Sequence, residues 1–79
     1  MFVEIVFAGL PIDRDKVEEA LDAAFGPDGE ITGAGSGMGR CHLDLEIEGG
    51  LDRGVTLERV RSVLAGLGVQ EYATLDVSD

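Results

Sequence analysis

The stretch Arg40-Cys-His-Leu-Asp-Leu-Glu-Ile-Glu48 alternates polar and apolar side chains along its whole length. Cysteine, leucine and isoleucine occupy every second position, and arginine, histidine and the acids occupy the positions between them. A repeat of two is typical of a β-strand that buries one face and leaves the other in water. The stretch therefore predicts a strand at 40–48 whose carboxylates lie on the face turned away from the core.

Three more strands are expected around this one. Residues 2–8 are β-branched and aromatic, and apolar residues on both faces of a strand indicate a central position in a sheet. Residues 30–36 predict a weaker strand, because glycine destabilises strand interiors and often marks a bulge. Residues 37–39, Gly-Met-Gly, then form a hairpin connection to the alternating stretch. Residues 71–77 alternate again and predict the last strand.

Two amphipathic helices are expected between the strands. Asp13 and Asp15 are the two expected caps of the first helix. Asp15 has a glutamate three residues later, which fits a capping box, and Gly26 is expected to end the helix. Thr56 is the expected cap of the second helix, which ends at Gly68. The apolar positions that predict the buried stripes are Val17, Ala20, Leu21, Ala24 and Phe25 in the first helix and Leu57, Val60, Leu64 and Leu67 in the second.

The order of these elements is strand, helix, strand, strand, helix, strand. It is the order of the split βαβ, or ferredoxin-like, sandwich, an α+β fold. Right-handed crossovers then place both helices on one face of a four-stranded antiparallel sheet, with the first and third strands in its centre. With 79 residues, the chain is expected to form a single domain over 1–79.

Composition excludes several classes of partner. Six Lys and Arg against sixteen Asp and Glu give a formal charge of −10, which disfavours binding to the phosphates of nucleic acids. No stretch approaches the ~20 apolar residues of a membrane span. The first residues have no basic region or cleavage site, so a signal peptide is not expected. A cytoplasmic protein with a reduced Cys41 is therefore predicted.

The sheet face that the helices leave uncovered is the candidate functional surface. Carboxylates surround a few apolar side chains there, an arrangement that suits a basic protein partner. The alternative is a solvated sheet face with no function, because antiparallel strands usually carry charge on their outer positions. The residues expected to bind the partner are Phe2, Glu4, His42, Asp44, Glu46, Glu48 and Tyr72.

No metal, cofactor or catalytic group is expected from the sequence. His42 with Asp44 or Glu46 could hold a cation loosely, but residues two apart on a strand lie roughly 7 Å apart at the backbone. Cys41 alternates with the leucines and is expected to be buried, on the face opposite to His42. No nucleophile and base are brought together by the pattern, so a non-enzymatic protein is predicted.

Glycines alternate at 33, 35, 37 and 39. They do not match the dinucleotide-binding fingerprint, which needs glycines at positions one, three and six of a turn that opens a helix. They predict a bulged edge strand that has little side-chain protection between Glu30 and Arg40. Such an edge could accept a strand from a second copy, which would give a homodimer through the glycine-rich strand.

Two resemblances suggest functions. The glycine-rich segment 29–39 followed by residues 43–47 resembles small, acidic, uncharacterised bacterial proteins of ferredoxin-like fold, some of which resemble immunity proteins. This resemblance implies a cytoplasmic, non-enzymatic binding protein, one form of which would be an immunity-type inhibitor of a basic toxin enzyme. The strand order is also similar to that of ACT domains, whose ligand loop follows the first strand, where Gly9 stands here. That second resemblance implies a small-molecule-binding regulatory domain that acts as a dimer.

Overall fold

Four strands and two helices follow one another in the expected order in the computed structural model, which describes residues 1–78. A short 3-10 turn follows each helix, at Gly26–Asp28 and at Gln70–Tyr72. Within residues 1–78, neither helix has the length and the apolar run that a membrane span requires. The elements are β1 (Phe2–Ala8), α1 (Arg14–Phe25), β2 (Gly29–Gly37), β3 (Arg40–Ile47), α2 (Arg53–Gly66) and β4 (Ala73–Ser78).

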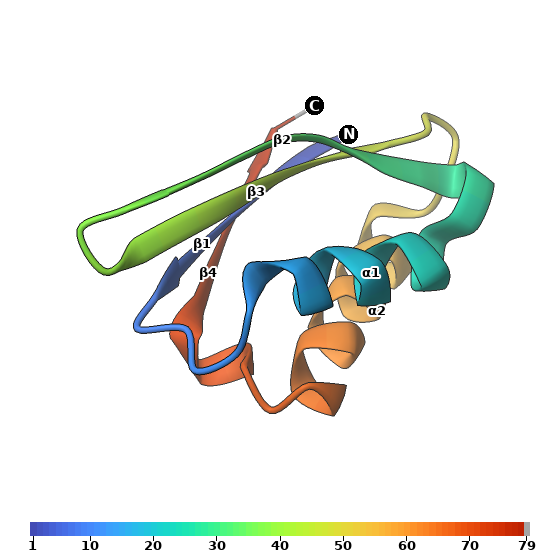
Figure 1. Ribbon diagram of the computed structural model, residues 1–79. Coiled ribbons are helices and arrows are strands. Elements are labelled where there is room, and N and C mark those ends of the chain that lie inside the picture. Colours follow the sequence, from blue (N-terminus) through green and yellow to red (C-terminus); the bar gives the residue numbers. More distant parts are fainter. Residues whose placement is uncertain (79) are drawn as a thin grey trace.

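The strands form one antiparallel sheet in the order β2-β3-β1-β4. Both helices lie on the same side of this sheet, and the opposite side is uncovered (Figure 1). β1 and β3 are central and β2 and β4 are edges, as the sequence predicts. The predicted ferredoxin-like α+β fold is therefore confirmed.

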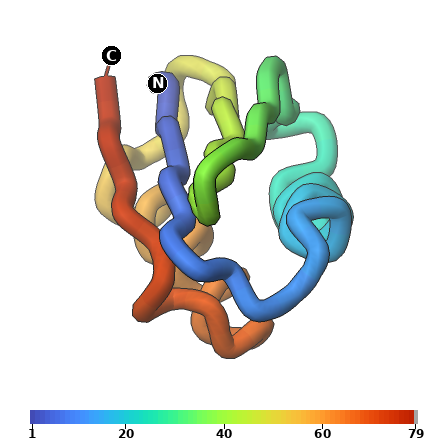
Figure 2. The backbone as a smooth tube through the Cα atoms, turned by 60° about the vertical axis from the view of Figure 1, so that its left-hand side comes forward, coloured from blue at the N-terminus to red at the C-terminus, as the bar shows by residue number. Residues whose placement is uncertain are grey.

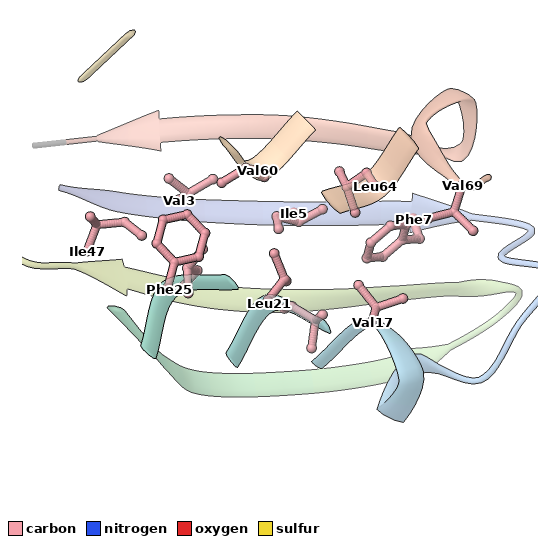
Figure 3. Packing of buried hydrophobic residues seen from close by; sticks show 12 residues of the cluster. Val3, Ile5, Phe7, Val17, Leu21, Phe25, Ile47, Val60, Leu64 and Val69 are labelled. Carbon is pink, nitrogen blue, oxygen red and sulfur yellow. The ribbon is translucent and has the colours of Figure 1, made fainter. Parts of the chain in front are cut away.

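The core lies between the sheet and the two helices, where apolar side chains from both layers meet (Figure 3). Almost no solvent reaches the alternating residues Val3, Ile5 and Phe7 of β1 and Leu43, Leu45 and Ile47 of β3, so the inward face predicted for β3 is confirmed at its three aliphatic positions. Among the expected helical positions, Leu57 is only partly buried and Ala24 is exposed. The buried apolar residues are Val3, Ile5, Phe7, Val17, Leu21, Phe25, Leu43, Leu45, Ile47, Val60, Leu64 and Val69.

The first helix begins at one of its two expected caps, and the second begins earlier than predicted. Asp13 occupies the cap position of α1, but its side chain makes no capping hydrogen bond. α2 begins one turn earlier than expected, because Asp52 accepts a hydrogen bond of 2.8 Å from the backbone N–H of Val55. Thr56 is therefore not a cap but a buried residue of the first turn, and its hydroxyl donates to the carbonyl of Asp52.

The last strand starts two residues later than predicted. Val69 is fully buried, so the chain must reach the core before it can turn into the sheet. The 3-10 turn that follows is closed by a hydrogen bond of 3.0 Å from the N–H of Tyr72 to the carbonyl of Val69. β4 then begins at Ala73, and Tyr72 is a turn residue rather than a strand residue.

The β2–β3 hairpin extends past the end of the helical layer (Figure 1). Met38 and Gly39 form its turn with φ values of 54° and 77°, the positive pair that a tight hairpin turn needs. The register of β2 against β3 shifts between Ile31 and Gly33, which confirms the predicted bulge. Because side chains alternate along a strand, this shift places the residues after it on the opposite face from the one that simple alternation gives.

The two ends of the described chain lie at the same end of the sheet. Phe2 of β1 pairs with Ser78 of β4, and Figure 2 shows the first and last strands running beside each other. Met1 extends the pairing of β1, since its carbonyl accepts a hydrogen bond of 2.7 Å from the N–H of Ile47. The first and last strands are thus held as neighbours by backbone pairing.

Candidate functional site on the uncovered sheet face

Three carboxylates form a row across the centre of the uncovered face, perpendicular to the strands, which we call the central rank. Glu4 of β1 lies directly opposite Asp44 of β3 and directly opposite Asp76 of β4. Side chains at directly paired positions of neighbouring strands lie on the same face, about 4.5–5.5 Å apart at Cβ. Like charges at such positions oppose folding, so this rank favours a cation or a positively charged group beside it.

The rows of paired residues on either side of the central rank contain different kinds of side chain. Toward the chain ends, Phe2 lies between Glu46 and Ser78, and Glu46 also faces Glu30 of β2. Toward the hairpin turn, Val6 lies between His42 and Thr74. The two apolar residues of β1 are half-buried and flank Glu4 along the strand. The face thus combines two apolar side chains of β1, separated by Glu4, with carboxylates on the neighbouring strands.

The seven residues predicted to bind a partner are not all brought together. Five of them occupy the paired central strands, namely Phe2, Glu4, His42, Asp44 and Glu46. Glu48 follows the end of β3 and Tyr72 precedes the start of β4, so the two lie beyond opposite ends of the sheet. Tyr72 is 37% exposed. Asp76, which the prediction left out of the site, stands in the central rank instead.

Two glycines of β2 make room for side chains of β3. Beyond the bulge, Gly33 pairs with Asp44 and Gly35 pairs with His42, on the uncovered face. A Cβ at Gly33 would stand 2.7 Å from Oδ2 of Asp44, and one at Gly35 would stand 2.7 Å from Cε1 of His42. The carboxylate and the imidazole therefore lean over the backbone of β2 into space that any larger residue would fill.

Because both side chains lean toward β2, the imidazole and the carboxylate lie closer together than the backbone spacing along β3 suggests. Nε2 of His42 lies 3.9 Å from Oδ2 of Asp44, although the two residues are two apart on one strand. One donor atom each of Glu4, His42 and Asp44 lie within 4.8 Å of one another, and all three residues are half-buried. Among residues 1–78, Oδ1 of Asp44 is shielded from solvent and has no hydrogen-bond partner. Glu4 was missed as a member of this group because its register against β3 is a long-range property.

Cys41 is half-buried rather than buried. It pairs with Phe7 on one side and with Ser36 on the other, so it lies on the helix side of the sheet, away from His42. Ser36 is exposed, because the hairpin extends past the helices, and this leaves Cys41 partly accessible. The expected separation of the thiol from the imidazole is confirmed, while its expected burial is wrong.

A shallow depression of about 670 Å³ lies beside the loop that follows β1. Apolar side chains of this loop meet the start of α1 and the hairpin there. Nε of Arg14, at the start of α1, is buried and has no hydrogen-bond partner within residues 1–78. Charged residues of both signs line it beside the apolar ones, including Leu10, Ile12, Asp13, Arg14, Asp15 and Arg40.

No protein-family model matches this chain, and no curated protein matches it. The uncovered face and the depression beside β1 are therefore the two surfaces from which a function can be inferred.

Proposed function

We propose that the protein is a non-catalytic interaction module that binds a basic protein partner through its uncovered sheet face, in the cytoplasm. The observation that supports this most directly is the rank Asp44, Glu4 and Asp76, three carboxylates in register on the side of the sheet that no helix covers. A positive partner would relieve the repulsion within this rank. It would also be attracted over a distance by the formal charge of −10.

The two apolar side chains of β1 on this face support the same proposal. Phe2 and Val6 are half-buried on either side of Glu4 along β1, and Phe2 lies directly opposite Glu46. Protein interfaces commonly have an apolar centre and a polar, charged rim. An immunity-type inhibitor of a basic toxin enzyme is one form of this proposal.

The test compares two sets of neutralised carboxylates. The face variant carries Glu4→Gln, Asp44→Asn and Glu46→Gln, and the control variant carries Glu19→Gln, Asp22→Asn and Glu58→Gln on exposed helix positions. Both lose three negative charges, so any difference between them reports position rather than net charge. Each protein is used to capture partners from an extract of the native cells, with a chelator present.

We expect a basic protein to be retained by the unmodified chain and by the control variant and to be lost with the face variant. With the purified partner, the association rate should fall as salt is raised. Retention of the same protein by the face variant, or an association rate that does not change with salt, would refute docking through this face.

A second candidate function is that of an ACT-like domain that binds a small molecule and acts as a dimer. It is favoured by the depression beside Gly9, which adjoins the exposed edge of β2. Within residues 1–78, β2 pairs only with β3, and Glu30 is the one charged residue of this strand. Sedimentation with and without added amino acids tests this candidate. A dimer that tightens with one amino acid supports it, and a monomer that binds none excludes it.

A further inference from the structure

We propose that Glu4, His42 and Asp44 form a binding site for a divalent transition-metal ion. Their donor atoms come from two central strands and lie within 4.8 Å of one another. Metal–ligand bonds of about 2.0–2.2 Å place donor atoms roughly 3–4 Å apart. The 3.9 Å between Nε2 of His42 and Oδ2 of Asp44 already falls in that range, so small side-chain rotations complete the set.

The surrounding backbone positions two of the three ligands. The bulge in β2 turns Gly33 and Gly35 toward the uncovered face, and the missing side chains leave the space that Asp44 and His42 occupy. Neither glycine is needed for an unusual backbone conformation, because neither has a positive φ. Their role at these positions is therefore spatial, and it brings the imidazole and the carboxylate over β2 rather than out into solvent.

The electrostatic surroundings of the three residues are unbalanced without a cation. Oδ1 of Asp44 is shielded from water and has no partner among the described residues, and buried polar atoms of this kind are rare. Glu4 stands between two further carboxylates, those of Asp44 and Asp76. A divalent ion would satisfy the first group and offset the repulsion around the second.

The ligand types indicate the class of ion. One imidazole nitrogen with two carboxylate oxygens suits Zn²⁺, Co²⁺ or Mn²⁺, whereas Ca²⁺ prefers an all-oxygen set of six or more ligands. Three protein ligands leave coordination positions for water, since His42 and Asp44 retain side-chain exposures of 41% and 25%. Metal binding at this site is a property of the free chain and requires no protein partner.

The test is a calorimetric titration of the full chain with ZnCl₂. We expect one ion per chain. His42 is the only histidine, so its ring gives a single set of NMR signals that report on the site. Addition of Co²⁺ should shift or broaden these signals selectively and should produce the visible absorption bands of a protein-bound cobalt ion.

Single variants distinguish a defined site from diffuse acidity. Glu4→Gln, His42→Gln and Asp44→Asn should each raise the Kd for Zn²⁺ by about tenfold or more, since each removes a direct ligand. Glu46→Gln lies on the same face outside the group and should change the Kd by less than about twofold, and Cys41→Ser on the other face should do the same. Equal losses with Glu4→Gln and Glu46→Gln would overturn the site, as would zinc binding that leaves the His42 signals unchanged.

A second pair of variants tests the geometry without removing a ligand. A Cβ at Gly35 would displace the ring of His42, whereas a Cβ at Gly37 would meet nothing within 4 Å. Gly35→Ala should therefore raise the Kd for Zn²⁺ several-fold, and Gly37→Ala should leave it unchanged. Equal Kd values for these two variants would refute the arrangement in which β2 positions the imidazole.

Discussion

Glu4 and Asp44 occupy directly paired positions on β1 and β3, with their carboxylates on the one sheet face that has no helix over it. This pair joins residues forty positions apart in the sequence through backbone pairing alone. It also sets two negative charges side by side in the middle of the sheet. Experiments can measure separately how much this repulsion lowers the free energy of unfolding and whether the pair binds a cation.

Neutralising Glu4 should stabilise the metal-free chain. Glu4→Gln removes repulsion toward both Asp44 and Asp76, and cross-strand pairs of this kind contribute about 0.2–1 kcal/mol each. We expect the free energy of unfolding, measured by urea denaturation with a chelator at low salt, to rise by roughly that amount. Glu19→Gln on the exposed side of α1 is the control. A gain that persists undiminished in high salt would contradict an electrostatic origin.

The two helix caps should differ in their contribution to stability. Asp52→Ala removes the side-chain hydrogen bond to the N–H of Val55 and should lower the free energy of unfolding by about 1 kcal/mol. Asp13 occupies the equivalent position of α1 without such a bond, so Asp13→Ala should cost clearly less. Thermal denaturation of both variants measures the difference, and equal losses would show that the hydrogen bond of Asp52 does not stabilise α2.

Truncation in the core should have the largest effect. Leu21 is fully buried between α1 and the sheet, and Leu21→Ala should lower the free energy of unfolding by about 2–5 kcal/mol. Val55→Ala is the matched control, because Val55 is 61% exposed at the start of α2. Urea midpoints compare the two. Similar midpoints would mean that α1 does not pack on the sheet through Leu21.

Gly29 should tolerate a side chain poorly, although its backbone is extended. A Cβ there would stand 3.1 Å from Cδ1 of the buried Ile47 and 3.3 Å from the carbonyl oxygen of Glu46. Gly29→Ala should therefore lower the free energy of unfolding by about 1 kcal/mol through overpacking. Gly37→Ala, in open space on the same strand, is the control and should be neutral or slightly stabilising. A neutral Gly29→Ala would show that this junction can expand without cost.

Local sequence patterns predict most of the fold, because the alternation of side chains shows which face of each strand is buried. The alternation at 40–48 determines which face of β3 is buried, and a shift by one residue would expose every leucine. Helix starts are less predictable, because Asp52 and Thr56 are both good caps one turn apart. Tyr72 could not be placed by alternation, since the burial of Val69 delays the strand.

The candidate metal site could not be predicted from the sequence, for a different reason. It needs the pairing of Glu4 with Asp44 and the bulge that turns Gly33 and Gly35 to the uncovered face. Glycine repeats indicate that a bulge is present, but they do not tell which way the residues after it will face. The sequence therefore predicts the carboxylate-rich face but not the convergence of three donor atoms within it.

The pairing of Phe2 with Ser78 places the start of β1 next to the end of β4. A short flexible linker could join the first strand to the last without disturbing any hydrogen bond of the sheet, because the neighbouring strands already meet at that end. New termini could then be opened at the exposed turn of Met38 and Gly39. Such a permuted molecule would keep the central rank of carboxylates while both of its free ends emerge at the far end of the hairpin.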